Sequence, residues 1–390
     1  MEVKHIYVHI PFCLKKCKYC DFTSIALNDD LFLREDLLDK YLKRLLFEIE
    51  SRFRIFGKPE SAVETIYFGG GTPTMLGNAR LLSVIQKIKE FCVLDGECEI
   101  TVETNPSVFN LEDYKKCLDA GFNRISIGVQ SFSDEVLKVI GRTHDKRSAD
   151  DAVQMASDAG FKNISIDLML GIPQAEGQKF NLVDFSNVPF DKITHISAYQ
   201  FGLCDNTPIK NDILSGRLLI AGEDEMAAEY IRFCEFMRQK GFLQYEISNF
   251  AKNENYISRH NFSYWLLKNY MGFGTSAVST DNFKRRTNCK DIFKYLNEDM
   301  GSEVCHEIET LTQAEKDEEA LILPLRTYLG IGVENIGTEK FGGIENKLKN
   351  FFELLDKNKL AVYNKGQFLK LTPSGYMVMN EIAAKILAAL

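Results

Sequence analysis

The sequence predicts an α/β fold: a partial (β/α)6 barrel of the TIM-like kind, followed by a C-terminal, mostly helical domain. In the first half of the chain, short runs rich in β-branched and aromatic residues alternate with longer amphipathic segments. This alternation predicts parallel strands joined by helical crossovers. It stops near residue 220, and a chain of 390 residues exceeds what one hydrophobic core usually holds. A second domain is therefore expected.

Six segments of the first half are predicted to be strands because they are short, apolar and bounded by turn residues. They are residues 5–10, 65–68, 99–103, 124–128, 163–168 and 195–200. Helices are predicted between them, at residues 33–53, 79–91, 111–120, 149–159 and 181–185. Barrels of this type collect ligands at the C-terminal ends of their strands. The residues that follow each strand are therefore the candidate site residues.

The chain is expected to have three parts: the barrel at 1–220, an extension at 221–299 and a C-terminal domain at 300–390. The extension begins with an amphipathic helix at 223–240. In the C-terminal domain, Thr312 and Glu315 form a capping-box pattern, and Thr372 with Pro373 begins the last helix. A hairpin is predicted around residues 364–366. Helices with a terminal hairpin resemble a winged helix, for which a packing or lid role is favoured here.

Charge and hydropathy exclude several partners. The chain has 47 Lys and Arg against 55 Asp and Glu, a net charge of −8, which disfavours a surface for nucleic acid. No apolar run is long enough to cross a bilayer, and no signal peptide is visible at the N-terminus. We therefore expect a cytoplasmic protein with no integral membrane segment.

Three of the ten cysteines, Cys13, Cys17 and Cys20, fall within eight residues directly after the first strand. Their C-x3-C-x2-C spacing suits three irons of a cubane cluster and leaves the fourth iron open to a chelating ligand. Structural zinc is the alternative, but it normally takes four protein ligands in paired C-x2-C units, and the sequence has no second pair. The other seven cysteines are scattered among apolar neighbours and are expected to be buried thiols.

The segment from Tyr7 through Cys13 and Cys20 to Phe22 resembles the signature of the radical S-adenosylmethionine (SAM) superfamily. More narrowly, it is similar to the group that contains the anaerobic coproporphyrinogen III dehydrogenase HemN and the heme chaperone HemW. The resemblance implies a 4Fe–4S cluster on the three cysteines, with SAM chelating the fourth iron. It also implies that reduction of the cluster, by an electron donor such as flavodoxin or ferredoxin, cleaves SAM to a 5′-deoxyadenosyl radical.

Polar and glycine residues follow the predicted strands. Gly70, Gly71 and Thr72 come after the second strand, where glycines let a ligand approach the backbone. Asp167 lies in a buried-strand pattern, where an unpaired carboxylate would be costly and needs a partner. The family resemblance implies that nine positions contact SAM: Tyr7, Tyr19, Gly70, Gly71, Thr72, Glu103, Gln130, Arg142 and Asp167.

Departures from the dehydrogenase pattern favour the chaperone. Phe22 stands where the dehydrogenase has a further cysteine, and only twelve residues precede Cys13. His260, Asn261, Tyr264 and Trp265 form what resembles the HNxxYW motif of the HemW family, which implies heme contact by these four residues. An imidazole suits heme iron, and aromatic rings suit the porphyrin face.

One position departs from the HemW pattern. Val278 stands where HemW relatives usually have a histidine in the glycine-rich stretch. If that histidine is the heme ligand, this chain binds heme differently or not at all.

The sequence thus supports two hypotheses. The first is a heme chaperone that passes heme to an acceptor protein, with a cluster and SAM that assist or regulate the transfer. The second is an enzyme, an oxygen-independent coproporphyrinogen III dehydrogenase that forms protoporphyrinogen IX. A third, radical modification of RNA, is disfavoured by the acidic charge and by the lack of an added RNA-binding module.

Overall fold

The computed structural model describes residues 3–27, 29–175, 185–297 and 305–388. The chain forms two compact units. Unit 1 comprises Met1–Ala221 and Lys268–Thr310, and unit 2 comprises Gly222–Leu267 and Leu311–Leu390. The segment predicted as one extension, residues 221–299, is divided between the two units.

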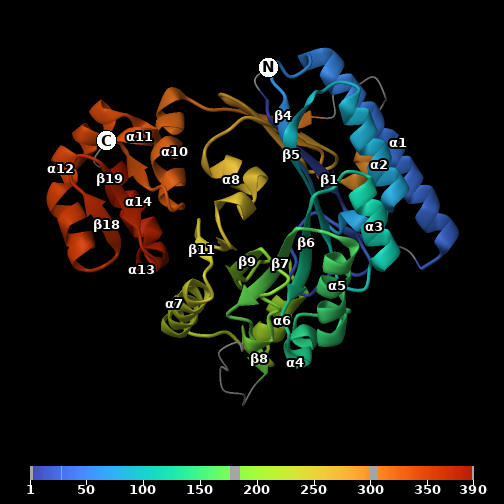
Figure 1. Ribbon diagram of the computed structural model, residues 1–390, viewed down its shortest axis with the longest axis horizontal. Coiled ribbons are helices and arrows are strands. Elements are labelled where there is room, and N and C mark those ends of the chain that lie inside the picture. Colours follow the sequence, from blue (N-terminus) through green and yellow to red (C-terminus); the bar gives the residue numbers. More distant parts are fainter. Residues whose placement is uncertain (1–2, 28, 176–184, 298–304, 389–390) are drawn as a thin grey trace. The chain divides into compact units, whose positions relative to one another are not determined.

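Unit 1 is built on a parallel sheet that contains all six predicted strands (Figure 1). The strands are β1 (His5–Ile10), β4 (Val63–Gly70), β5 (Leu94–Thr104), β6 (Arg124–Gln130), β7 (Asn163–Leu170) and β9 (His195–Gln200). Their order in the sheet is β9-β7-β6-β5-β4-β1, and every neighbouring pair is parallel. The predicted partial barrel is confirmed.

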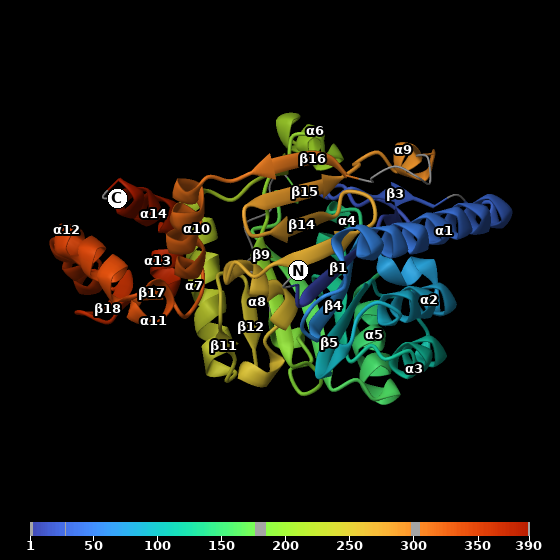
Figure 2. The same ribbon diagram turned by 90° about the horizontal axis from the view of Figure 1, so that it is seen from above.

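The sheet continues beyond β1 with strands that were not predicted. Strand β13 (Tyr270–Phe273) pairs with β1 in parallel, and β14 (Val278–Asp281), β15 (Lys284–Asn288) and β16 (Cys305–Thr310) follow it in antiparallel order. Figure 2 shows β14, β15 and β16 side by side. Shorter strands of unit 1 are β2 (Phe12–Cys13), β3 (Ile25–Ala26), β8 (Gln174–Ala175) and β10 (Leu218–Leu219).

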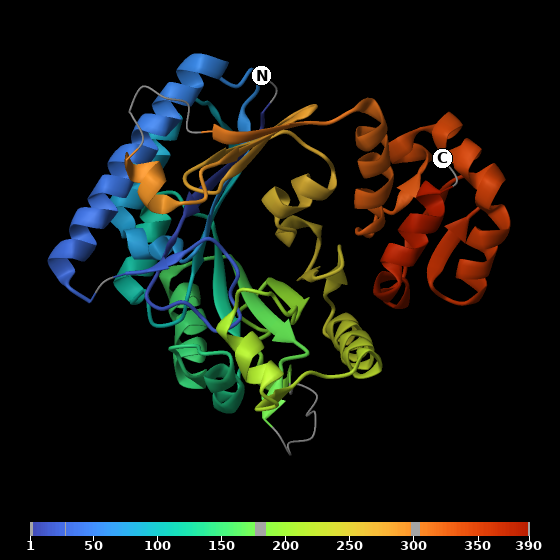
Figure 3. The same ribbon diagram turned by 180° about the vertical axis from the view of Figure 1, so that it is seen from behind.

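Helices cover one face of the parallel sheet. They are α1 (Leu31–Phe56), α2 (Asn78–Lys89), α3 (Leu111–Asp119) and α5 (Lys146–Ala159), as predicted (Figures 1 and 3). Unit 1 also contains α4 (Asp134–Val139), α6 (Pro208–Leu214), α9 (Ile292–Asn297) and the short 3-10 helices η1 (Pro73–Leu76) and η2 (Phe185–Asn187). Residues 181–184 of the predicted helix at 181–185 lie outside the described residues.

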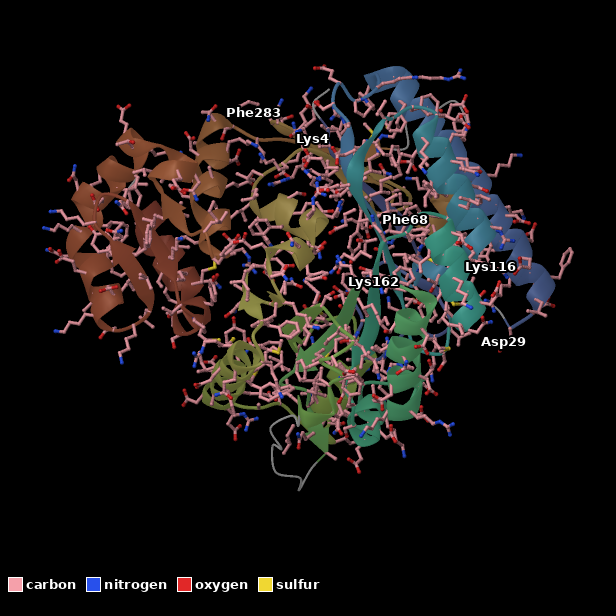
Figure 4. The ribbon with its side chains drawn as sticks, in the orientation of Figure 1. Lys4, Asp29, Phe68, Lys116, Lys162 and Phe283 are labelled. Atoms are coloured by element: carbon pink, nitrogen blue, oxygen red, sulfur yellow. The ribbon has the colours of Figure 1, made fainter. Side chains whose placement is uncertain are left out.

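The two faces of the parallel sheet differ in polarity because side chains alternate along a strand. Ile6 and Val8 of β1 are fully buried, and Phe68 of β4 packs edge-on against Phe122 at 5.1 Å between ring centroids. Figure 4 labels Phe68 in this layer and Lys116 on the outer side of α3. The opposite face of the sheet carries polar side chains, and the candidate site lies on that face.

Unit 2 is mostly helical and contains the expected hairpin, β18 and β19, before its last two helices. Its helices are α7 (Glu223–Gln239), η3 (Glu254–Tyr256), α8 (Arg259–Trp265), α10 (Gln313–Leu325), α11 (Val333–Ile336), α12 (Thr338–Lys357), α13 (Pro373–Met377) and α14 (Met379–Leu387). Strands β11 (Leu243–Gln244) and β12 (Asn249–Ala251) pair with each other. Strands β17 (Ile331–Gly332), β18 (Ala361–Asn364) and β19 (Phe368–Leu371) form a sheet in the order β17-β19-β18.

Local sequence signals explain where unit 2 helices begin. The side chain of Thr312 accepts a hydrogen bond from Glu315 N, and the side chain of Glu315 accepts one from Thr312 N, which completes the predicted capping box of α10. Thr372 caps α13 by accepting from Gly375 N at 3.2 Å. Across the described ranges of the chain, no helix combines the length and apolar character that a membrane crossing requires.

The cysteines outside the N-terminal group are mostly buried, as expected. Cys92, Cys98, Cys117, Cys234 and Cys289 are buried thiols, whereas Cys204 is half-buried. The side chain of Cys305 lies outside the described residues.

Candidate functional site

The three clustered cysteines lie on one loop at the C-terminal end of β1. Cys13 ends β2, which pairs in parallel with β3, so Cys17 and Cys20 lie on the connection between these two short strands. Cys20 N donates to Cys17 O at 3.3 Å, and Lys18 N donates to Ile140 O at 3.1 Å. These bonds hold the loop against the end of α4. Cys13 is buried, and the other two thiols are half-buried.

A chain of hydrogen bonds joins two of these thiols through residues that follow other strands. Arg142 Nη1 donates to Cys17 Sγ at 3.4 Å, and Arg142 Nη2 donates to Asn105 Oδ1 at 2.5 Å. Asn105 Nδ2 donates to Thr72 Oγ1 at 2.7 Å, and Thr72 Oγ1 donates to Cys13 Sγ at 3.7 Å. The loop is thus tied to the residues that follow β4 and β5.

Asn105 was not among the predicted site residues. Its signal in the sequence is its place directly after β5, two residues beyond Glu103 and next to Pro106. Arg142 also donates to the carbonyl oxygen of Gly128. A Cβ atom at Gly128 would lie 2.6 Å from Asn105 Oδ1, so glycine is required there for the Asn105 amide to fit.

The predicted glycine turn packs directly on the cysteine loop. Gly71 N donates to Ile10 O at 2.9 Å, and Thr72 N donates to Phe12 O at 2.7 Å. A Cβ atom at Gly71 would lie 2.7 Å from Phe12 O. At Gly70, where φ is +114°, it would lie 2.6 Å from the ring of His9. The backbone therefore approaches its neighbours so closely that only glycine is accommodated.

Glu103 lies at the end of β5 and faces this turn. Its Oε1 accepts from Tyr67 OH at 2.6 Å, and its Oε2 accepts from Gly70 N at 3.3 Å. Tyr7 stacks on Tyr67, with 6.2 Å between ring centroids. Burial raises the pKa of Glu103 to about 7, against the hydrogen bond from Tyr67, which favours the ionised form. The carboxyl group can therefore change charge near neutral pH.

Asp167 has the partners that its buried position required. Ser126 Oγ donates to Asp167 Oδ1 at 3.1 Å, and Ser197 supplies a second side-chain hydrogen bond. Burial nevertheless raises the pKa of Asp167. Arg124, which is 1% exposed and was not predicted as a site residue, lowers the pKa values of both Glu103 and Asp167 through its charge.

Two of the residues that the resemblance assigns to SAM, Gln130 and Tyr19, lie at the end of β6 and on the cysteine loop. Gln130 has a left-handed backbone at φ 66°, and its Oε1 accepts from Tyr199 OH at 2.5 Å. Tyr19, on the cysteine loop, packs with Tyr199 against a core that includes Leu137 and Ile140. The structure thus places all nine residues that the resemblance assigned to SAM on unit 1.

His9 links β1 to the cysteine loop, a role that the sequence did not indicate. Its Nε2 is 2.9 Å from Thr23 O, and its Nδ1 is 3.0 Å from Tyr7 OH. Burial lowers the pKa of His9 to about 4. Its imidazole is therefore neutral at pH 7, and it orients Tyr7 rather than supplying charge.

The donor set on the loop suits a cluster better than a single metal ion. Within the described ranges, no group of three or more His, Cys, Asp or Glu side chains is arranged to hold one metal ion. The thiolates that hold a cubane cluster need not point at one common atom, because each of them binds a different iron. Cys13, Cys17 and Cys20, with the Arg142 charge at Cys17, would supply three such thiolates. The glycine turn packs against the same loop through the N–H groups of Gly71 and Thr72.

The predicted heme residues lie on α8 of unit 2. His260 is 0% exposed, and its Nε2 is 2.7 Å from Tyr264 OH, with the two rings edge to face. Asn261, Tyr264 and Trp265 are half-buried. The guanidinium of Arg326 lies 4.6 Å from the centroid of the Trp265 ring. The imidazole of His260 is therefore engaged inside the unit, and the partly exposed surface of α8 is formed by its neighbours.

Val278 lies on β14 of unit 1, where its backbone packs tightly. A Cβ atom at Gly272 would lie 2.1 Å from Val278 O, so β13 needs glycine opposite this residue. The Val278 side chain is half-buried and offers no group that could bind iron.

The resemblance implies that Glu103 contacts SAM, so a Glu103→Gln variant is expected to remove a pH dependence from SAM binding. Because the pKa of Glu103 is about 7, its carboxyl group loses its charge as the pH falls from 8 to 6. SAM carries a sulfonium cation, so the affinity of the native protein should fall about tenfold over this range. Anaerobic equilibrium dialysis measures it. A matched Glu97→Gln variant, changed on the exposed part of β5, should keep the native profile. An unchanged profile in Glu103→Gln would contradict the assignment.

Comparisons with known proteins show the family of the chain. A sequence model of the radical SAM superfamily matches residues 7–181. The chain is 34% identical to the heme chaperone HemW of Lactococcus lactis, and the match covers 98% of this chain and 96% of that protein. It is 32% identical to HemW of Bacillus subtilis over the full length of both chains. Among solved structures, the coproporphyrinogen III oxidase HemN of Escherichia coli superposes with a TM-score of 0.79 over 100% of this chain and 91% of that chain, at 21% identity.

Proposed function

Because the chain belongs to the HemW family of radical SAM proteins, we propose that it is a heme chaperone, which binds heme and passes it to an acceptor protein. The observation that carries the proposal is the full-length match to chaperones of this family, which includes unit 2 as well as the barrel. HemN shares the fold, but at 21% identity the likeness extends to the fold alone. The cytoplasm, which keeps thiols reduced, suits the loop of three free cysteines.

The radical SAM family implies a 4Fe–4S cluster and SAM. We propose that Cys13, Cys17 and Cys20 hold the cluster and that Tyr7, Tyr19, Gly70, Gly71, Thr72, Glu103, Gln130, Arg142 and Asp167 contact SAM. When bound, the cluster supplies an electron that can cleave SAM. The protein itself orients the loop through Thr72, Asn105 and Arg142 and supplies negative charge through Glu103 and Asp167.

Heme contact is proposed for the surface of α8 around Asn261, Tyr264 and Trp265. Tyrosine and tryptophan present flat apolar faces with a polar edge, which suits a porphyrin. Arg326, beside the Trp265 ring, could pair with a heme propionate. His260 holds Tyr264 in place in the structure, so its imidazole would reach heme iron only after that hydrogen bond opens.

Heme binding to α8 can be followed through Trp265, the only tryptophan of the chain. Heme bound at this helix should quench nearly all tryptophan fluorescence at one heme per chain. A Tyr264→Ala variant should bind heme about tenfold more weakly, because a large aromatic contact is lost. A Phe351→Ala variant on α12 is the matched control in the same unit and should bind as the native protein does.

The same preparation separates the chaperone from the dehydrogenase. Reduced protein with SAM and coproporphyrinogen III, incubated without oxygen, should form no protoporphyrinogen. Phe22 supports this expectation, because it occupies the place of the dehydrogenase's additional cysteine. Sustained turnover, or heme that leaves the fluorescence of Trp265 unchanged, would overturn the proposed function.

A further inference from the structure

The histidines whose side chains the structure describes are all withdrawn from the surface. The sequence has six histidines, and five of these side chains are described. None of the five is more than 6% exposed, and each has a ring nitrogen within 3.0 Å of a hydrogen-bond partner: His5, His9, His144, His195 and His260. Val278 stands where HemW relatives usually have a further histidine. None of the five described imidazoles is therefore presented to heme iron.

Tyr264 is the hydrogen-bond partner of one of these rings. Its hydroxyl oxygen lies 2.7 Å from His260 Nε2, and the two rings meet edge to face at 82°. The residues are four positions apart on α8 and so share one face of the helix. Tyr264 is half-buried, whereas His260 is 0% exposed. Of this pair, the phenol reaches the surface and the imidazole supports it from the interior.

Tyrosine can hold heme iron, as histidine does in other proteins. It binds ferric iron as the phenolate, but a phenol with the ordinary pKa of about 10 keeps its proton at neutral pH. A base in hydrogen-bond contact removes this obstacle, because it takes the proton as the metal–oxygen bond forms. His260 is such a base for Tyr264.

A second side chain at this surface suits an anionic ligand. The guanidinium of Arg326 lies 4.6 Å from the centroid of the Trp265 ring, and Arg326 Nε is buried without a hydrogen-bond partner among the described residues. The buried carboxylate of Glu246 accepts its hydrogen bonds from Ser248 N and Asn249 Nδ2. Arg326 therefore keeps a donor for a carboxylate of a ligand, such as a heme propionate.

We propose that Tyr264, with His260 as its base, is the protein ligand of ferric heme iron in this chain. The proposal rests on the proposed function, in which heme binds at α8. As heme binds, the bond between iron and the Tyr264 oxygen forms and the phenol O–H bond breaks. The proton passes to His260 Nε2, which becomes an imidazolium, and a water molecule leaves the iron. The iron remains ferric throughout.

Removal of the phenol oxygen tests the ligand directly. The full chain, saturated with ferric heme, should show a phenolate-to-iron charge-transfer band in the absorption spectrum and phenolate vibrations in resonance Raman. Tyr264→Phe keeps the ring and loses only the oxygen, so it should lose both signals and still quench the fluorescence of Trp265. Tyr363→Phe, on β18 of the same unit, is the matched control and should keep the native spectrum.

Removal of the base tests the role of His260. His260→Gln should keep the phenolate signals but bind heme about tenfold more weakly, because a hydrogen bond to a charged group is lost. If His260 were itself the ligand, the result would be reversed: His260→Gln would change the iron coordination, and Tyr264→Phe would keep the native spectrum. That reversal would overturn the proposal.

The fluorescence of Trp265, measured on the same samples, separates this failure from that of the proposed function. Heme that leaves the native fluorescence unchanged would overturn both proposals. Quenching without phenolate signals in the native protein, or equal loss of those signals in Tyr363→Phe, would overturn only the assignment of Tyr264 as the ligand.

Discussion

Replacing Cys17 by alanine is expected to reduce the iron and sulfide content of anaerobically prepared protein to less than about a tenth of the native value. Only two thiolates would then remain on the loop, and Arg142 would lose its sulfur partner. Far-ultraviolet circular dichroism should be native-like, because Cys17 is half-buried in a loop and contributes little to the core.

Cys234→Ala is the matched control for this loss. Cys234 is a buried thiol on α7 of unit 2, outside the unit that contains the loop. This variant should retain the full iron and sulfide content. An undiminished cluster in Cys17→Ala, or equal loss in Cys234→Ala, would show that the loop is not the cluster site.

Asn105→Ala should have the next largest effect and weaken SAM binding roughly 30-fold, about 2 kcal/mol. The change removes the acceptor of Arg142 Nη2 and the donor to Thr72 Oγ1 at once. The cationic Arg142 would lose a charge-assisted hydrogen bond, and the link between Cys13 and Cys17 would be broken. Anaerobic equilibrium dialysis measures the affinity, and iron analysis shows whether the cluster remains.

An Asn105→Asp variant refines this test. Aspartate still accepts from Arg142 but cannot donate to Thr72, so its affinity should fall between those of the native protein and Asn105→Ala. Asn211→Ala, on the exposed face of α6, is the matched control and should bind SAM normally. Native affinity in Asn105→Ala would mean that the hydrogen-bonded chain does not position the loop.

The parallel strands could be predicted from the sequence because they are buried on one face by helices. Strands such as β1 and β6 therefore consist of apolar residues at alternate positions, which leaves a local signal. Strand β13 has no such local signal in the sequence. Its residues Tyr270–Phe273 include a glycine. Its partner strand, β1, lies more than 250 residues earlier in the sequence, so no local pattern indicates the pairing. Only the folded chain shows that partner.

The candidate site divides in the same way. Residues at or just beyond the ends of strands, such as Glu103 and Thr72, could be proposed for the site because the fold class assigns function to that position. Asn105 occupies the same kind of position but acts only through Thr72 and Arg142, which lie far from it in the sequence. His260 shows the opposite case: its chemistry suits heme iron, but tertiary packing buries it and pairs it with Tyr264.

Electron paramagnetic resonance of the reduced protein, with iron and sulfide analysis, tests the central claim most directly. Protein prepared without air should contain about four irons and four sulfides per chain and give the signal of a reduced 4Fe–4S cluster. Addition of SAM should change that signal, because the ligand binds the iron that the three cysteines leave open. The account would be contradicted if the loop held zinc or no metal, or if the cluster signal did not change when SAM was added.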